Sequence, residues 1–228
     1  MNIFFDEEGF NQLETLMENH DKVFILTDDN IDKLYPSLLA SASSHKTYKI
    51  VLPHGEHNKN LDAACHIWNE MMQHEAGRDA MMINLGGGTI SDIGAFAASC
   101  FKGGIDFVNI PTTLLAMVDA AIGGKNGVNF NKIKNQIGLF SEPQCVIINT
   151  DFLKSLDKRD INAALSEMMK FSFIADKSFL DIDNENYKDY IVKAAMLKDE
   201  IVSMDMKEKG MRKILNFGHT IGHAIETF

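Results

Sequence analysis

The sequence predicts an α/β fold in which a mostly parallel sheet, with helices on both faces, is followed by an α-helical region. Within the first 150 residues, short apolar runs of strand length alternate with segments that have helical periodicity. One of these runs ends in three consecutive glycines at residues 86–88, immediately before a helical pattern. After about residue 150 the patterned segments are helical and apolar strand runs are absent.

Each predicted element rests on its own run of residues. Strands are expected at residues 23–27, 48–52, 80–85, 107–110 and 145–149. The spacing of apolar side chains predicts helices at residues 61–75, 91–101, 161–175, 187–206 and 214–228. We therefore divide the chain into an α/β domain at residues 1–150 and the start of an α-helical domain at residues 151–228.

The composition excludes several classes of protein. The chain has 22 Lys and Arg against 32 Asp and Glu, and its net charge of −10 argues against nonspecific binding to nucleic acid or to an anionic membrane. A local basic pocket for an anionic small molecule remains compatible with this charge. Cys65, Cys100 and Cys145 are far apart and form no CxxC pair, so we expect a reducing, cytoplasmic location. We expect neither a signal peptide nor a membrane-spanning helix, since no apolar run reaches ~18 residues.

The glycines at residues 86–88 are the first strong signal. Without Cβ atoms the backbone can approach a ligand closely, and N–H groups at the start of a helix can bind phosphate. Thr89 or Ser91 could cap this helix, and Asp92 would lie in its first turn. The motif is not GxGxxG, and a tight strand-to-helix turn is the alternative. Three consecutive glycines exceed what a turn needs, which favours a phosphate-binding loop.

Asp28 and Asn30 close the strand expected at residues 23–27. An acid directly after a strand can hold the hydroxyl groups of a ribose. It can also cap a helix or stabilise a turn, and on the evidence of this residue alone the structural role is favoured.

Residues 110–138 carry a high density of polar and basic side chains. Thr112 and Thr113 follow an expected strand, where hydroxyl groups can meet a ligand. Further along the segment are Asp119, Gly123, Gly124, Asn129, Asn135 and the lysines Lys125, Lys132 and Lys134. Three cations close together in an acidic chain indicate an anion site, and a solvated basic loop is the alternative.

Two pairs of polar residues have helical spacing. Glu167 and Lys170 stand three residues apart and share a helix face, where a surface ion pair is the usual interpretation. His219 and His223 stand four apart, a spacing by which two imidazoles can reach one metal ion or one substrate. A divalent metal would need at least one more ligand, and a carboxylate such as Glu167 is suitable.

Six motifs together resemble the 3-dehydroquinate synthase family of sugar-phosphate cyclases. They are PHGEHNK (53–59), NLGGGTISD (84–92), IPTTLLAMVDAAIGGK (110–125), KNQIG (134–138), SEMMK (166–170) and RKILNFGHTIGHAIE (212–226). The resemblance runs from about residue 28 to residue 228. It implies a fold shared with glycerol dehydrogenase and the iron-type alcohol dehydrogenases.

The resemblance implies an NAD-dependent lyase that also requires Zn²⁺ or Co²⁺. Such an enzyme converts 3-deoxy-D-arabino-heptulosonate 7-phosphate into 3-dehydroquinate and phosphate, a step of the shikimate pathway of aromatic amino-acid biosynthesis. Transient oxidation by NAD, elimination of phosphate and an intramolecular aldol closure would follow one another, so that NAD is recycled. The usual form of the family is a homodimer.

The resemblance also implies which residues form the site. The positions that match NAD contacts are Asp28, Glu56, Lys59, Gly87, Gly88, Asp92, Thr112, Thr113, Lys125, Lys134 and Ser155. The positions that match catalytic or substrate-binding residues are Asp119, Lys125, Asn135, Lys170, Lys198, Arg212, Asn216 and His223. Glu167 and His219 match metal ligands.

Two features depart from the family's pattern. Gly103 stands where an arginine that helps to bind the substrate's phosphate is expected, and Lys102 could replace it only without the bidentate geometry of arginine. The chain also ends before the histidine that would be the third metal ligand. We therefore expect residues 1–228 alone to bind zinc weakly and not to turn over substrate.

Three alternatives remain open at this point. The protein could be a cyclase for another sugar phosphate, an NAD- and metal-dependent polyol dehydrogenase of the same fold, or a non-catalytic relative that binds nucleotide. A polyol dehydrogenase would accumulate NADH, and a non-catalytic relative would bind NAD without releasing phosphate. Asp119, followed by the GGK and KNQIG segments, favours the cyclase because these residues suit a phosphorylated acid better than a neutral polyol.

Overall fold

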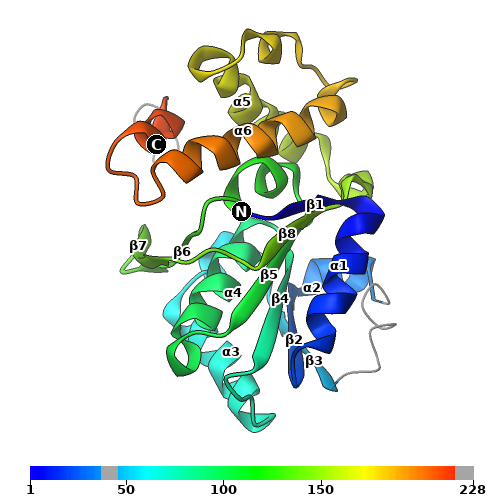
Figure 1. The fold of residues 1–228 in the computed structure, drawn as a ribbon, viewed down its shortest axis with the longest axis vertical. Coiled ribbons are helices and arrows are strands. Elements are labelled where there is room, and N and C mark those ends of the chain that lie inside the picture. Colours follow the sequence, from blue (N-terminus) through cyan, green and yellow to red (C-terminus); the bar gives the residue numbers. More distant parts are fainter. Residues whose placement is uncertain (37–45, 219–228) are drawn as a thin grey trace.

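The structure, a computed structural model, describes residues 1–36 and 46–218. Its larger part is a six-stranded sheet with the order β1-β8-β5-β4-β2-β3, in which every neighbouring pair is parallel (Figure 1). The strands are β1 (Ile3–Phe5), β2 (Lys22–Asp28), β3 (Lys46–Leu52), β4 (Ala80–Gly86), β5 (Asp106–Pro111) and β8 (Cys145–Ile148). The predicted α/β fold with a parallel sheet is confirmed.

Helices cover both faces of this sheet (Figure 1). One face carries α1 (Asp6–Glu18) and α2 (Asp29–Leu34), and the other carries α3 (Leu61–Gln73) and α4 (Gly88–Cys100). Val23 and Ile25 of β2 belong to the core under α1, whereas Phe24 and Leu26 belong to the core under α4. Because β2 is buried on both faces, its sequence is a continuous apolar run.

The strand order places a crevice between β2 and β4. The chain leaves β2 for its neighbour β3 on one side, and leaves β4 for its neighbour β5 on the other side. Open parallel sheets bind ligands beyond the carboxyl ends of their strands at such a reversal. Asp28 ends β2 and Gly86 ends β4, so the first of the predicted cofactor residues lie at this crevice.

A two-stranded antiparallel hairpin, β6 (Lys125–Phe130) and β7 (Ile133–Phe140), packs beside α4. It lies apart from the main sheet (Figure 1). The fully buried Val128 joins the hairpin to the core under α4. No strand was predicted here, because polar residues and glycines interrupt the apolar pattern of both strands.

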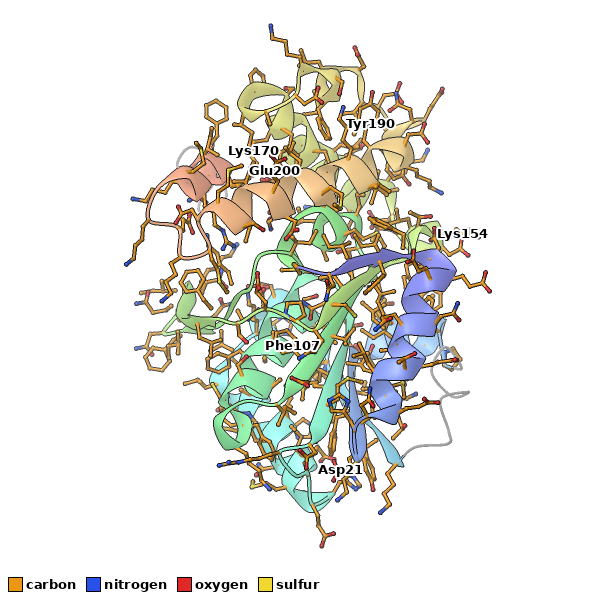
Figure 2. All side chains as sticks on the ribbon, in the orientation of Figure 1. Asp21, Phe107, Lys154, Lys170, Tyr190 and Glu200 are labelled. Carbon is orange, nitrogen blue, oxygen red and sulfur yellow. The ribbon has the colours of Figure 1, made fainter. Side chains whose placement is uncertain are left out.

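Helices α5 (Lys158–Ile174) and α6 (Ile191–Met204) lie above the sheet in Figure 1. Side chains fill the space between these helices and the strands (Figure 2). No strand follows β8 within residues 149–218, which agrees with the prediction that the chain is helical after about residue 150. None of the helices in the described ranges is long and apolar enough to cross a membrane.

Some predicted boundaries are wrong. The helix expected from residue 91 already begins at Gly88. Within the segment expected to be a helix at 214–228, the described residues end in a 3-10 helix at Met211–Asn216, and residues 219–228 lie outside the description. Strand β1 and helices α1 and α2 were not predicted. β1 has three residues and α1 begins without a capping side chain, so both lack a clear signal.

Candidate active site

The start of α4 forms a binding surface directly after β4. Gly87 is the N-cap, and no side chain there bonds the N–H groups of the first turn. A Cβ atom on Gly87 would lie 3.1 Å from Cγ2 of Thr113, and one on Gly88 would lie 3.0 Å from Cβ of Ala120. The buried hydroxyl of Thr112 has no hydrogen-bond partner in the described part of the chain. These features suit the pyrophosphate of a dinucleotide.

The expectation that Thr89 or Ser91 caps α4 is wrong. The helix begins at Gly88, so both residues lie inside its first turn, and their hydroxyl groups bond elsewhere. Thr89 donates from Oγ1 to Oε2 of Glu56 at 2.8 Å, and Ser91 donates back to the backbone at the helix start. Asp92 consequently falls in the second turn of the helix rather than the first.

Lys59 is buried in a network that joins three segments of the chain. It is 3% exposed, pairs with the carboxylate of Asp92 on α4, and donates to Oδ1 of Asn135 on β7 at 2.6 Å. Burial raises the pKa of Asp92 to about 6, although the positive charge of Lys59 acts in the opposite direction. The charge of Lys198 also acts on Asp92, so this network adjoins a second cluster of cations.

Glu56 connects the start of α4 to the hairpin. Its Oε2 accepts from Thr89, and its Oε1 accepts from Nδ2 of Asn129 at 2.9 Å. Oδ1 of Asn129 in turn accepts from the backbone N–H of Asn135 at 2.9 Å. Glu56, Lys59, Asp92 and Asn135, all predicted site residues, are therefore brought together, with Asn129 as an additional member.

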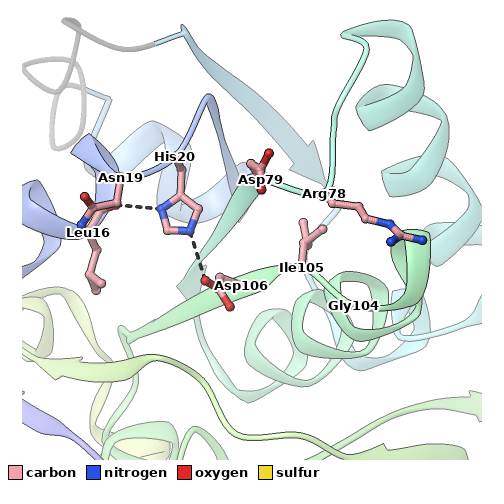
Figure 3. A pocket seen from close by; sticks show the side chains of 8 residues that line it. All are labelled: Leu16, Asn19, His20, Arg78, Asp79, Gly104, Ile105 and Asp106. Atoms are coloured by element: carbon pink, nitrogen blue, oxygen red, sulfur yellow. Dashed lines mark hydrogen bonds and ion pairs between the residues drawn. The ribbon is translucent and has the colours of Figure 1, made fainter.

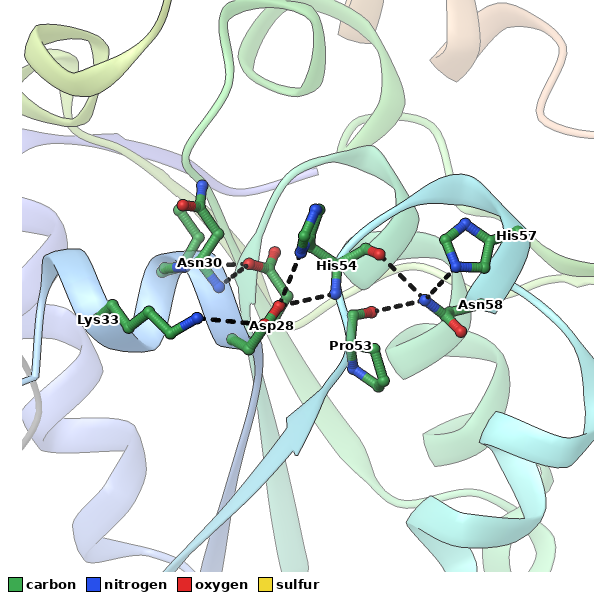
Figure 4. A network of polar contacts seen from close by, with 9 residues as sticks. Asp28, Asn30, Lys33, Pro53, His54, His57 and Asn58 are labelled. Carbon is green, nitrogen blue, oxygen red and sulfur yellow. Dashed lines mark hydrogen bonds and ion pairs between the residues drawn. The ribbon is translucent and has the colours of Figure 1, made fainter.

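Asp28 caps α2, which is the structural role that its position after a strand favours (Figure 4). Its Oδ1 accepts from the backbone N–H groups of Asn30 at 3.0 Å and Ile31 at 2.9 Å. Beside it, Oδ1 of Asp29 lies 2.9 Å from both the backbone N and Nδ1 of His54, and these hydrogen bonds lower the pKa of Asp29 to about 2. Both capping bonds of Asp28 use one oxygen, so its carboxylate has a second acceptor to offer to a ribose.

Four further candidates, one serine and three lysines, lie on other segments. Ser155 follows β8, and its hydroxyl lies 2.9 Å from that of Tyr35. Lys134 is exposed on β7. Lys132 lies in the turn between β6 and β7, and Lys125 begins β6 at the other end of the hairpin. The expectation that Lys125, Lys132 and Lys134 form one anion site is therefore wrong.

A different set of cations gathers near the helices above the sheet. Three are nearly buried: Lys170 on α5 is 8% exposed, Lys198 on α6 is 5% exposed, and Arg212 is 2% exposed. Burial lowers the pKa of Lys198 and of Arg212. Burial, followed by the charges of Arg212 and Lys198, lowers the pKa of Lys125 to about 8. Buried positive charges close together favour an anionic ligand.

Carboxylates hold these cations in place. Nζ of Lys198 lies 2.7 Å from Oδ1 of Asp119 and also bonds the backbone carbonyl of that residue. Lys170 pairs with Glu167 and donates to the carbonyl oxygen of Leu215 at 2.7 Å. Because Lys170 is buried, this pair is not the surface ion pair that its spacing alone favours.

Glu208 belongs to the same cluster and was not predicted. Its carboxylate pairs with Lys125 and accepts from Nδ2 of Asn216, so it joins two predicted site residues. It lies in the loop between α6 and the final 3-10 helix. Charged residues are common in such loops, and the acid carries no sequence signal beyond its place four residues before Arg212.

Gly123 makes room for Arg212. Nη1 of the guanidinium donates to the carbonyl oxygen of Met206 at 2.7 Å, and Nη2 faces the turn before β6. Gly123 has a φ of +106°, and a Cβ atom there would lie 2.6 Å from Nη2. Glycine is therefore required at this position both for the backbone conformation and for the close approach.

The predicted metal centre is only partly within the described residues. Glu167 is described, whereas His219 and His223 lie outside the described residues. In the part of the chain that is described, no three His, Cys, Asp or Glu side chains gather as a metal site. One carboxylate alone does not make a metal site, so the described residues do not by themselves account for the expected metal.

Gly103 and Lys102 lie at the opposite edge of the sheet from the candidate site. They follow α4, whose 13 residues span about 20 Å. Lys102 lies over the ring of Phe101, with Nζ 5.6 Å from the centroid. The hollow of about 380 Å³ nearby is formed at the amino ends of β4 and β5 (Figure 3). Within one chain, therefore, Lys102 cannot replace the expected phosphate-binding arginine.

Asp92 gives the fold a specific pH dependence. Its folded pKa of about 6 lies above the ordinary 3.8, so between pH 4 and 6 the folded state keeps a proton that the unfolded state releases. The carboxyl group of Asp92 therefore stabilises the folded state more strongly as the pH falls from 6 to 4. This stabilisation is lost as the pH rises again. We expect Asp92→Asn to remove this contribution. The free energy of unfolding of Asp92→Asn, measured in urea and relative to that of the parent chain, should rise by up to about 3 kcal/mol from pH 4 to pH 7. A difference that stays constant across this range would contradict the assignment.

The family model described as 3-dehydroquinate synthase N-terminal matches residues 49–163, and the one described as 3-dehydroquinate synthase C-terminal matches residues 164–228. A 3-dehydroquinate synthase of Parabacteroides distasonis is 43% identical over 218 residues, which are 91% of this chain and 62% of that protein. That of Ruminiclostridium cellulolyticum is 42% identical over 98% of this chain and 66% of its own length. The chain thus spans somewhat less than two thirds of these relatives.

Solved structures share the fold. A 2-deoxy-scyllo-inosose synthase complexed with carbaglucose-6-phosphate, NAD⁺ and Co²⁺ superposes with a TM-score of 0.86 at 23% identity, over 99% of this chain and 67% of that one. ValA, a 2-epi-5-epi-valiolone synthase from Streptomyces hygroscopicus with NAD⁺ and Zn²⁺ bound, gives a TM-score of 0.86 at 25% identity, with the same coverage.

Proposed function

The chain belongs to the 3-dehydroquinate synthase family, and from this membership we propose that the whole protein is a lyase of the shikimate pathway. Its reaction is the conversion of 3-deoxy-D-arabino-heptulosonate 7-phosphate into 3-dehydroquinate and phosphate. The observation that carries the proposal is the cluster of Lys170, Lys198 and Arg212, three nearly buried cations in a chain of net charge −10. A substrate with a phosphate and a carboxylate would add charge-assisted hydrogen bonds to these cations.

We propose that NAD lies across the carboxyl edge of the sheet between β2 and β4. The N–H groups at the start of α4 would bind its pyrophosphate, and Asp28 would bind the adenosine ribose. This edge is supported on one side by the hydrogen-bonded network of Lys59, Asp92 and Glu56. The residues proposed to complete the contacts are Gly87, Gly88, Thr112, Thr113, Lys125, Lys134 and Ser155. Two solved structures of this fold have NAD⁺ bound, which supports the choice of cofactor.

We further propose that Glu167 and His219 would hold a Zn²⁺ or Co²⁺ ion, the metals named with the two neighbouring structures. Such an ion would supply a Lewis acid that polarises the substrate hydroxyl to be oxidised. A divalent metal would need at least one ligand in addition to these two.

The residues of this chain bind and orient the substrate. Lys198 and Arg212 neutralise its anionic groups, and Lys170 adds a third positive charge. Asp119 holds Lys198 at 2.7 Å and so fixes where that ammonium group points. The residues proposed to orient the reacting end of the substrate are Asp119, Lys125, Asn135, Asn216 and His223. Because most of these cations are buried, water competes little with the substrate for them.

The assignment of a separate function to each of the two domains is also a proposal. Residues 1–150 would bind NAD, and residues 151–228 would begin the metal- and substrate-binding domain. The contacts of Lys198 with Asp119 support this arrangement, because they place a cation of α6 directly on the α/β part. We propose a homodimer, as the resemblance to the family implies, and a cytoplasmic location, as the widely spaced cysteines suggest.

The proposed activity can be tested with the full-length protein, NAD, Zn²⁺ and the heptulosonate phosphate. Phosphate release and absorbance at the NADH wavelength are followed together. We expect stoichiometric phosphate release without accumulation of NADH. NADH accumulation with a polyol substrate would instead identify a dehydrogenase of the same fold, and phosphate release from a different sugar phosphate alone would identify another cyclase.

Gly87→Ala tests the place of the cofactor. A methyl group at this position enters the space before α4, 3.1 Å from Cγ2 of Thr113, where the pyrophosphate is proposed to lie. We expect the Kd for NAD, measured by calorimetry, to rise at least about tenfold, the equivalent of 1.4 kcal/mol. Gly77→Ala is the matched control, since its Cβ atom would meet nothing closer than 3.6 Å. Equal NAD affinity in both variants would remove the start of α4 from the cofactor site.

A further inference from the structure

The turn at residues 121–125 connects two groups of the candidate site. Asp119 lies just before the turn, and Lys125 is its last residue and begins β6. Gly123 and Gly124 within the turn have φ values of +106° and +63°. Glycine has the greatest conformational freedom of any residue. The turn therefore needs contacts from outside itself if Asp119 and Lys125 are to keep fixed positions.

A buried amide holds the first end of the turn. Asn109 on β5 is 3% exposed, and its Nδ2 donates to the carbonyl oxygen of Ala121 at 3.1 Å. Its Oδ1 accepts from Nδ2 of Asn84, its direct neighbour on β4, at 2.9 Å. Because Asn84 supplies a donor to the oxygen, the amide of Asn109 is fixed in the orientation that directs its own donor at the turn.

A second buried amide holds the other end. Asn126 is 8% exposed, and its Nδ2 donates to the carbonyl oxygens of Gly124 at 3.2 Å and Ser141 at 2.7 Å. The backbone N–H of Ser141 also donates to the carbonyl oxygen of Gly124 at 2.9 Å. Asn126 thus closes the base of the hairpin, where the chain enters β6 and leaves β7.

We propose that Asn109 and Asn126 are positioning residues for the reaction, which fix the turn at residues 121–125 from both ends. Through this turn they keep Asp119 and Lys125 against the cations of α6 and the final 3-10 helix. Neither asparagine is proposed to touch substrate or cofactor. The inference rests on the proposed function, because the positions matter only if the cation cluster binds the reacting substrate.

The stability of the sheet alone does not account for Asn84 and Asn109. A polar side chain in the centre of a sheet is unfavourable unless it is hydrogen-bonded, and apolar residues would fill the same space without that cost. Oδ1 of Asn84 has no hydrogen-bond partner among the residues described, so the Asn84–Asn109 pair is not even fully satisfied. Orientation of the turn supplies a reason for keeping polar groups at these places.

The test uses Asn126→Leu in the full-length enzyme, since leucine keeps the shape and removes both donors. A displacement of about 1 Å at a reacting group can cost about a hundredfold in rate. We expect kcat to fall by about tenfold to a hundredfold, while the KM for NAD stays within about threefold. Asn126→Ser, which keeps a shorter donor, should recover part of the loss. Trp68→Phe is the control, because it removes one side-chain hydrogen bond, from Nε1 to the carbonyl oxygen of Ala97, far from the turn.

A second readout does not depend on activity. Asp119 on the preceding helical turn, Lys198 on α6, and Arg212 and Glu208 on the final segment all face Lys125. Burial and the two neighbouring positive charges hold the pKa of Lys125 at about 8. If the turn moves toward solvent, that pKa returns toward its ordinary 10.5. We expect NMR titration of labelled lysine, assigned with Lys125→Arg, to show a rise of about 1 or more in Asn126→Leu.

The possible results separate this inference from the proposed function. A fall of kcat together with a raised pKa of Lys125 supports it. If the parent enzyme releases no phosphate, the proposed function fails, and the titration of Lys125 alone decides the positioning role. Asn109→Leu is the second variant, to be used in both measurements if Asn126→Leu does not fold. Unchanged kcat and an unchanged pKa of Lys125, as in Trp68→Phe, would overturn the proposal.

Discussion

Replacing Lys198 by methionine is expected to remove most of the activity while leaving the fold intact. Lys198 is 5% exposed and lies at the centre of the cation cluster, in contact with Asp119 and near Lys125, Lys170 and Arg212. Removing one preorganised electrostatic contact to a reacting group costs about a hundredfold to a thousandfold in rate. We expect kcat/KM for the sugar phosphate to fall by about a hundredfold or more, and the Kd for NAD to change by less than about threefold.

The substitution is chosen so that folding does not confound the result. Methionine is unbranched and only one atom shorter than lysine, and it carries no charge. Burial already disfavours the charged form of Lys198, as the lowered pKa shows. Lys193→Met on the same helix is the matched control, because Lys193 is half exposed and pairs with Asp176 at the surface. Both variants should unfold within about 1 kcal/mol of the parent chain. If Lys198→Met kept a third or more of the parent activity, the cation cluster would not be the substrate site.

Lys198 also shows where reasoning from the sequence stops. A lysine on a helix is normally exposed, and nothing in its immediate neighbours distinguishes Lys198 from Lys193. Only the resemblance to a family singled it out. Burial of its side chain depends on α6 lying over the end of the sheet, a contact between segments 79 residues apart. Information of this kind is absent from any local window of the chain.

Other parts of the site could be predicted because the residues that determine their structure are adjacent in the sequence. The strand–glycine–helix segment at residues 80–100 has an apolar run, a turn and a periodic helix in direct succession, and all three are present in the structure. Asp28 was open between a helix cap and a ligand contact; its capping bonds confirm the first role, and its contact with a ribose stays a proposal. Glu208 and the hairpin at residues 125–140 could not be predicted, because long-range contacts rather than local patterns place them.

The predicted phosphate-binding loop depends on how closely α4 packs on the sheet, and Gly94→Ala tests that packing. A Cβ atom on Gly94 would overlap Oδ1 of Asn84, lie 2.5 Å from its Cγ, and lie 2.8 Å from Cδ2 of Leu26. The amide of Asn84 is fully buried and bonded to Asn109, so it cannot turn aside without breaking that bond. Helix α4 must therefore move away from β4.

The expected loss of stability is large for so small a change. Overpacking of a core costs about 1–3 kcal/mol, and a broken buried hydrogen bond costs about 1–3 kcal/mol more. The higher helix propensity of alanine returns at most about 1 kcal/mol. We expect Gly94→Ala to lower the free energy of unfolding by about 3 kcal/mol and the Tm by about 6–12 °C. Gly77→Ala, with an uncrowded Cβ atom, should change stability by less than about 1 kcal/mol.

Adding Asn84→Ala to Gly94→Ala distinguishes the proposed clash from a general effect on the helix. Removal of the amide opens the space that the new methyl group needs, so the double variant should be less destabilised than the sum of the two single variants. Because α4 begins at Gly88, the shift in Gly94→Ala should also weaken NAD binding, and the double variant should recover part of it. Additive losses in the double variant would show that Asn84 does not set the distance between α4 and the sheet.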